Sequence, residues 1–139
     1  MKLLSLTIRG FRSFREEVSV SFEPGTYFLL GVNRDDPAFD SNGSGKTSFI
    51  AAIAFVLRGR IHTGIAKDKL INNDSDECFV EAVFSNGLIV RRKKKRGQAE
   101  GLSYFHEGRW FDGDLAPTQE GLDKILGMSD TLFFQGIWI

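Results

Sequence analysis

The chain has 139 residues, of which 42% are apolar and 26% charged, with 18 basic and 18 acidic side chains. This length and composition fit one globular domain with a substantial core and exclude a disordered or fibrous chain. Because the net charge is zero, any argument for a polyanionic partner must rest on a local cluster of charge. The single cysteine, Cys78, cannot form an internal disulfide. We therefore expect it to be buried as a small apolar residue, in a protein of a reducing compartment.

Two segments near the N-terminus alternate apolar and polar residues, which predicts half-buried strands at residues 4–8 and 18–22. A Pro-Gly pair at 24–25 then marks a turn. The apolar run at 26–30 predicts a strand that is buried on both faces and ends at Gly31.

Apolar residues recur at helical spacing over residues 49–57, and Gly59 ends this predicted helix. Residues 60–77 are polar and irregular. The segment 78–92 contains an Asn-Gly pair at 86–87 between two apolar stretches, which predicts a β-hairpin.

A second hairpin is predicted at 102–111, with its turn at Glu107-Gly108. Residues 119–126 then predict a helix that follows Pro117 and stops at Gly127. Helix and strand patterns thus both occur, and the predicted fold class is α/β.

The chain has neither a signal-peptide pattern nor an apolar run near the ~20 residues that span a bilayer. We expect a cytoplasmic protein without membrane contact. The apolar stretch at 133–139 has no polar terminus to cover it, so we expect a piece of a longer protein or a half-domain that needs a second segment.

The stretch "GSGKTS" at residues 43–48 has the composition of a phosphate-binding loop. Its glycines let consecutive backbone N–H groups curl around phosphates, and the start of the following helix attracts the same anion. Lys46 is predicted to reach the β and γ phosphates of ATP as the catalytic cation, and the Thr47 hydroxyl to hold Mg²⁺. The predicted ATP contacts are Asn42, Gly43, Ser44, Gly45, Lys46, Thr47 and Ser48.

Asp40 stands where such a loop usually has its first glycine. Since Gly31 already ends the preceding strand, we interpret residues 32–41 as an insertion that leaves the loop itself undisturbed. The alternative is a glycine-rich helix entry that holds no ligand.

Four stretches in this order, "IRGFRSF", "SNGSGKTS", "KDKLINN" and "ILGMSDTLFFQ", resemble the N-terminal ATPase lobe of SbcC-type proteins. These proteins belong to the SMC-like branch of ABC ATPases and serve DNA double-strand break repair. The short form is similar to the phage recombination-endonuclease subunits. The resemblance covers nearly all 139 residues and implies a P-loop NTPase fold, the N-terminal half of an ABC-type head with an antiparallel β subdomain.

The resemblance implies roles for three further residues. Arg12 and Ser13 match residues near the nucleotide, where a guanidinium can pair with phosphate oxygens. Gln135 matches the Q-loop glutamine, which completes the Mg²⁺ shell and orients the attacking water. The acidic strand that supplies the general base and the signature segment are missing from the sequence. In the family both lie on a C-terminal lobe beyond a coiled coil.

The family's mechanism implies several partners. ATP is sandwiched between two heads, so we expect a homodimer of heads, each completed by its own C-terminal lobe. We also expect an SbcD-type nuclease subunit and double-stranded DNA. The isolated chain is expected to turn over essentially no ATP.

The run "RRKKKR" is the one local cluster of positive charge. It comprises Arg91, Arg92, Lys93, Lys94, Lys95 and Arg96. It predicts either DNA phosphate contact or a solvated end of the hairpin. Because side chains alternate along a strand, only about half of the run can face a duplex together.

The aromatic residues Tyr104, Phe105, Trp110 and Phe111 suggest either base stacking or a packed hairpin face. His62 and His106 have no partner at ligand spacing, which disfavours metal binding by either. Two rival functions remain: another SMC-like ATPase, such as a RecF-like or defence-system member, or a nucleotide-gated interaction module that does not hydrolyse ATP.

Overall fold

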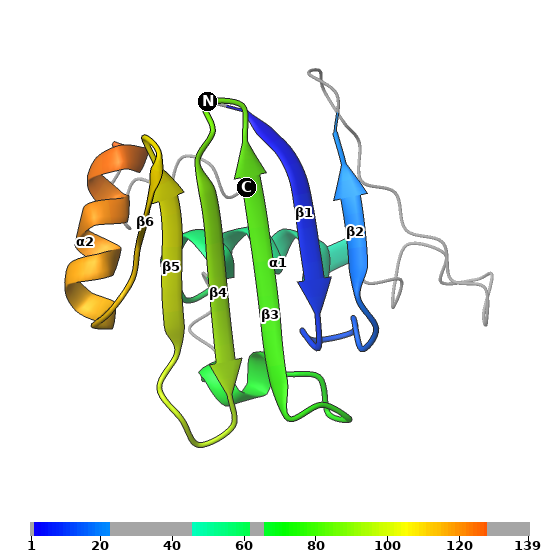
Figure 1. Ribbon diagram of the computed structural model, residues 1–139. Coiled ribbons are helices and arrows are strands. Elements are labelled where there is room, and N and C mark those ends of the chain that lie inside the picture. Colours follow the sequence, from blue (N-terminus) through cyan, green and yellow to red (C-terminus); the bar gives the residue numbers. More distant parts are fainter. Residues whose placement is uncertain (1, 23–45, 62–65, 128–139) are drawn as a thin grey trace.

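The computed structural model describes residues 2–22, 46–61 and 66–127 (Figure 1). The predicted strand at 26–30, the insertion at 32–41, His62 and Gln135 lie outside the described residues, as do the loop residues Asn42, Gly43, Ser44 and Gly45. Of Lys46 and Thr47 only the backbone is described.

The described strands form a six-stranded antiparallel sheet in the order β2-β1-β3-β4-β5-β6. Their bounds are β1 Leu3–Arg9, β2 Val18–Ser21, β3 Glu77–Phe84, β4 Ile89–Lys95, β5 Gly101–His106 and β6 Arg109–Phe111. Both predicted N-terminal strands and both predicted hairpins are therefore confirmed.

Helix α1, Lys46–Arg58, crosses one face of the sheet behind β1, β3 and β4 in Figure 1. We call this side the inner face and the opposite side the outer face. Phe55 and Val56 of α1 are completely buried, as are Leu6, Ile8 and Val80 of the sheet. Apolar burial between α1 and the inner face thus forms the core.

Helix α2, Leu115–Leu126, lies beside β5 and β6 at the edge of the sheet. It begins four residues earlier than predicted, because Pro117 lies in its first turn, where the missing N–H has no helical partner to lose. Its stop at Gly127, with φ +68°, is as predicted. The 3₁₀ helix η2, Lys67–Leu70, interrupts a segment predicted to be irregular.

Within the residues that the structure describes, neither helix is long and apolar enough to cross a bilayer.

Candidate nucleotide site and the basic strand

The start of α1 is the described part of the predicted phosphate site. Lys46 is the first residue of the helix, and Ser48 is buried at 6% exposure. Ala51 and Ala52 lie almost completely buried below them, so the first turns sit directly on the inner face. The free backbone N–H groups of a helix start favour an anion. The described geometry is therefore compatible with the predicted loop, whose own contacts lie outside the described residues.

The "GFRSF" turn follows β1 and carries Arg12 and Ser13. Phe11 and Phe14 exchange two backbone hydrogen bonds of 3.0 and 2.8 Å, which close the turn. Gly10 has φ +63°, and a Cβ there would lie 2.2 Å from the carbonyl oxygen of Glu77, so only glycine fits. The turn is consequently fixed against β3.

Phe11 connects this turn to the predicted phosphate site. Its side chain is completely buried, and its ring centroid lies 5.3 Å from that of Phe55 in α1. Arg12 has φ +48° and is half-buried, whereas Ser13 is exposed. The packing therefore fixes the backbone of Arg12 relative to α1.

The segment "KDKLINN" holds the same turn from the other side. The backbone N–H of Arg12 donates to the carbonyl of Leu70 at 2.7 Å. The Asn72 side chain donates to the carbonyl of Arg12 at 2.6 Å, and its backbone N–H donates to Gly10 at 2.7 Å. Two of the stretches that carry the family resemblance thus meet in space. Sequence reasoning assigned no role to Asn72, and the shared family pattern was the only signal for it.

The basic run divides between the two faces of β4. Arg92 is 1% exposed and Lys94 8%, whereas Arg91, Lys93 and Lys95 are exposed. The DNA-contact prediction is therefore wrong for Arg92 and Lys94, because their charged groups bond within the protein. The predicted alternation along the strand is confirmed.

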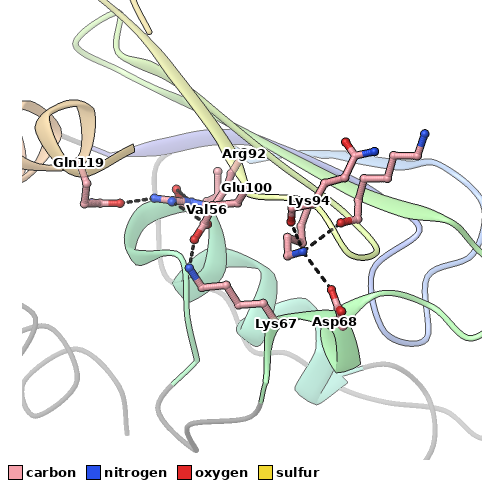
Figure 2. Close-up of polar contacts among 9 residues, drawn as sticks. Val56, Lys67, Asp68, Arg92, Lys94, Glu100 and Gln119 are labelled. Atoms are coloured by element: carbon pink, nitrogen blue, oxygen red, sulfur yellow. Dashed lines mark hydrogen bonds and ion pairs between the residues drawn. The ribbon is translucent and has the colours of Figure 1, made fainter. Parts of the chain in front are cut away.

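Figure 2 shows Arg92 at the centre of a buried polar cluster on the inner face. Its Nε donates to the carbonyl of Val56 at 3.1 Å and its Nη1 to Glu100 Oε2 at 3.0 Å. Its Nη2 donates to Gln119 of α2. The second Glu100 oxygen pairs with Lys67 of η2. Burial, followed by repulsion from the nearby cations, lowers the pKa of Lys67.

Lys94 bonds to the loop that follows β4 and to η2. Its Nζ donates to the carbonyls of Lys95, at 2.9 Å, and Gln98, and pairs with Asp68 Oδ1 at 3.0 Å. The hydrogen bond from Lys94 lowers the pKa of the Asp68 carboxyl. Arg96 donates to the carbonyls of Ser75 and Asn72 at 3.1 and 3.0 Å, and of Asp68 at 3.3 Å. It therefore braces the turn before β3.

The outer face of β4 has a different character. Arg91 pairs with Glu81 at 2.5 Å, and its guanidinium carbon lies 4.5 Å from the ring centroid of Trp110. Trp110 is 42% exposed. Both groups thus remain accessible to solvent on this face.

The aromatic hairpin also divides. Tyr104 and Phe111 stack on the inner side with centroids 4.9 Å apart, and Tyr104 is 4% exposed, as a packed face predicts. Phe105 and Trp110 form a tilted pair on the outer side, 5.5 Å apart. The prediction of a packed hairpin face is therefore confirmed for Tyr104 and Phe111. It is wrong for Trp110, whose ring is exposed.

Cys78 is completely buried, as predicted, and burial raises the pKa of its thiol to about 11. His106 faces Glu107 at 3.6 Å. The described part of the chain holds no group of three or more side chains able to ligate a metal ion.

Comparison with known proteins identifies the family of this chain. A family model described as an AAA domain matches residues 5–130. The chain belongs to the AAA domain family. This domain extends over the Arg12 turn, the start of α1 and all of the described sheet except the first two residues of β1.

Relatives of this AAA domain include DNA repair ATPases. The RecF DNA replication and repair protein of Vibrio vulnificus is 34% identical over 86 residues, which are 62% of this chain and 21% of that protein. The DNA double-strand break repair Rad50 ATPase of Methanocaldococcus jannaschii is 24% identical over 143 residues, 98% of this chain and 13% of that protein. The chain thus spans well under a third of these relatives.

A solved structure from work on ATP-driven dimerisation and DNA-stimulated activation of SMC ATPases has a TM-score of 0.69 and 23% identity. The match covers 91% of this chain and 78% of that one. The AAA domain therefore has the P-loop ATPase fold of the SMC and RecF heads.

Proposed function

We propose that this chain is the ATP-binding N-terminal lobe of an SbcC-type ATPase head that controls a DNA repair or recombination nuclease. The observation that carries the proposal is the packing of the Arg12 turn against α1 through Phe11 and Phe55. It holds a guanidinium-bearing turn in fixed relation to the helix whose start would receive the phosphates.

The residues assigned to the nucleotide have different roles, which follow from their chemistry. The backbone N–H groups of Asn42 to Ser48 and the Lys46 ammonium bind the phosphates, and Arg12 and Ser13 approach them from the β1 turn. Thr47 and Gln135 would hold Mg²⁺, which would neutralise charge on the phosphates. Gln135 also orients the water that attacks.

The general base comes from the C-terminal lobe in this proposal, and two complete heads close on ATP. Because only the closed dimer brings all groups together, ATP binding favours that state and hydrolysis releases it. The exposed cations Arg91, Lys93 and Lys95 would contact the phosphates of double-stranded DNA. An SbcD-type subunit would supply the nuclease.

The test is Mg-ATP titration by calorimetry of the full-length protein that contains this lobe. We expect Lys46→Ala to weaken ATP binding at least about tenfold, because one charge-assisted phosphate contact is lost. Lys124→Ala is the matched control, since it removes one exposed ammonium group from α2, which is outside the segments assigned to the nucleotide. Equal affinity of the Lys46 variant and the wild type would refute the nucleotide assignment.

Sedimentation and phosphate release then separate the steps of the cycle. We expect ATP to shift the full-length protein towards a head dimer. Gln135→Ala should bind ATP and dimerise but lose turnover, since its side chain acts on the attacking water. Wild-type turnover in this variant would remove Gln135 from the catalytic residues. Dimerisation without any turnover in the wild type would support the nucleotide-gated interaction module.

A RecF-like ATPase is the second candidate, because the RecF relative is 34% identical. The chain that follows Gln135 in the full-length protein distinguishes the two. A long heptad-patterned segment supports the SbcC-type assignment, and a short connection to the second lobe supports a RecF-like protein.

A further inference from the structure

The C-terminal end of α1 has its backbone carbonyls satisfied one after another. The Phe55 carbonyl accepts from the N–H of Gly59 at 2.7 Å. The Val56 carbonyl accepts from Arg92 at 3.1 Å, and the Leu57 carbonyl from the Gln119 side chain at 3.0 Å. The last carbonyls of a helix have no partner within the helix. The bond from Gly59 is local, whereas the other two come from β4 and α2. They fix the axial position and the rotation of α1.

A cation at this end also matches the helix dipole. The C-terminal end of a helix is partially negative, and the guanidinium of Arg92 meets it directly. Its guanidinium carbon lies 5.9 Å from the ring centroid of Phe55, the residue before Val56. Charge and shape therefore both favour arginine at this position.

Helix α2 contributes a second set of contacts to the same end. Gln119 accepts from Arg92 and donates to Asp123 at 2.9 Å, and Asp123 accepts from Arg58 at 2.6 Å. Gln119 and Asp123 are four residues apart and thus lie on one face of α2. The end of α1 is consequently held between β4 and α2.

The same cluster reaches the Arg12 turn. Glu100 accepts from Arg92 and pairs with Lys67, the first residue of η2. The last residue of η2, Leu70, accepts the backbone N–H of Arg12. A short chain of contacts therefore joins Arg92 to both segments that are assigned to the nucleotide.

Stability alone does not explain this arrangement. Replacing a buried ion pair by well-packed apolar residues is often neutral or stabilising, so the Arg92–Glu100 pair by itself is weak evidence for a purely stabilising role. Directed bonds to two successive carbonyls give a fixed orientation that apolar contacts do not give. For a helix whose start must aim N–H groups at phosphates, an error of about 1 Å is costly.

We propose that Arg92 is a positioning residue for the nucleotide: from the inner face of β4 it fixes the end of α1 and, through Glu100 and Lys67, the η2 segment that holds Arg12. The inference rests on the proposed ATP site. Arg92 touches no nucleotide and acts only through these elements.

The test removes the buried pair as a pair, with Arg92→Met and Glu100→Leu together in the full-length protein. Lys67 is 41% exposed and can then turn to water. Mg-ATP affinity is measured by calorimetry, and the thermal midpoint without nucleotide by calorimetric scanning. We expect cooperative unfolding with a lowered midpoint, since the Val56 carbonyl loses its donor, and an affinity about tenfold weaker.

Three further variants test the result more closely. Arg92→Lys keeps the charge without the planar fork and should recover part of the affinity. Lys124→Met on α2 is the control and should bind ATP as the wild type does. If the double variant unfolds, Gln119→Met decides: it removes the bonds of Gln119 to the Leu57 carbonyl, to Arg92 and to Asp123, but keeps Arg92 bonded to Val56 and Glu100. It should weaken ATP binding about threefold.

Wild-type affinity in the folded double variant, or in Gln119→Met where the double variant unfolds, would overturn the inference. A parallel Lys46→Ala sample shows which claim has failed. If it loses ATP while the double variant keeps it, only the role of Arg92 is wrong. If Lys46→Ala also binds normally, the proposed nucleotide site itself is wrong.

Discussion

The two sides of β4 use the same residue types for opposite purposes. On the inner face, Arg92 and Lys94 are buried and bond to backbone carbonyls and carboxylates of other elements. On the outer face, Arg91, Lys93 and Lys95 are exposed. The five cations of the run that lie in β4 therefore form two sets, because the pleat of a strand sends alternate side chains to opposite faces, and Arg96 follows the strand.

The difference shows what makes a buried cation tolerable. Each inner cation bonds to residues that are distant in sequence: Val56 and Gln119 for Arg92, and Asp68 for Lys94. Arg91 is satisfied by Glu81, its direct neighbour across the β3–β4 pair. The inner cations are thus part of the tertiary structure, and Arg91 depends on local pairing.

The largest expected effect comes from removing one inner carboxylate. Glu100→Gln leaves the guanidinium of Arg92 buried without its negative partner, which we expect to cost about 3–5 kcal/mol of unfolding free energy. Glu81→Gln breaks the exposed pair with Arg91 and should cost less than about 1 kcal/mol. Urea unfolding of both variants measures the difference. Equal losses would mean that the two faces do not differ as described.

The next largest expected effect is on DNA binding, and it involves only the cations of the outer face. Replacing Arg91, Lys93 and Lys95 by serine in the full-length protein should weaken duplex binding and flatten its salt dependence. Each lost phosphate contact lowers the slope by about 0.9, so a reduction of about 2–3 is expected. Lys124→Ser is the control. An unchanged slope, measured by fluorescence titration at several salt concentrations, would favour a merely solvated hairpin.

A third prediction concerns Cys78, which lies on the inner face opposite Lys94. Because burial raises its pKa to about 11, very little thiolate exists near neutral pH. We expect the native thiol to react with a disulfide reagent at least about a hundredfold more slowly than the thiol in denaturant. Comparable rates in native and denatured protein would show that the inner face is open.

The smallest expected effect is the pH dependence that Asp68 adds. Its pairing with Lys94 lowers its pKa below the ordinary 3.8, so the folded state releases this proton more readily than the unfolded chain. Its contribution is present above pH 3.8 and is lost as the pH falls through the lowered value. Asp68→Asn should therefore flatten the acid limb of a urea-midpoint profile. Parallel profiles for variant and wild type would contradict the Lys94 contact.

The local patterns of the sequence predicted most of the described elements. Alternation gave β1 and β2, Asn86-Gly87 placed the first hairpin, and Gly127 marked the end of α2. These features depend on neighbours within a few residues. The start of α2 was missed because Pro117 was interpreted as preceding the helix, although the first turn tolerates it.

The candidate site was predictable only in part, for a related reason. Helical spacing and "GKTS" placed the start of α1, but nothing local brings Asn72 to Arg12 or Gln119 to Arg92. Such contacts arise when segments far apart in sequence pack together. The buried half of the basic run could not be separated from the exposed half without knowing which face α1 covers.

The central claim is that the loop leading into α1 and the Arg12 turn hold one nucleotide between them. The most direct measurement is the structure of the full-length protein with Mg²⁺ and a non-hydrolysable ATP analogue. We predict that the triphosphate lies at the start of α1, with Lys46 at its β and γ phosphates and the Arg12 guanidinium facing it. A nucleotide bound elsewhere, or a start of α1 without any phosphate contact, would contradict this account.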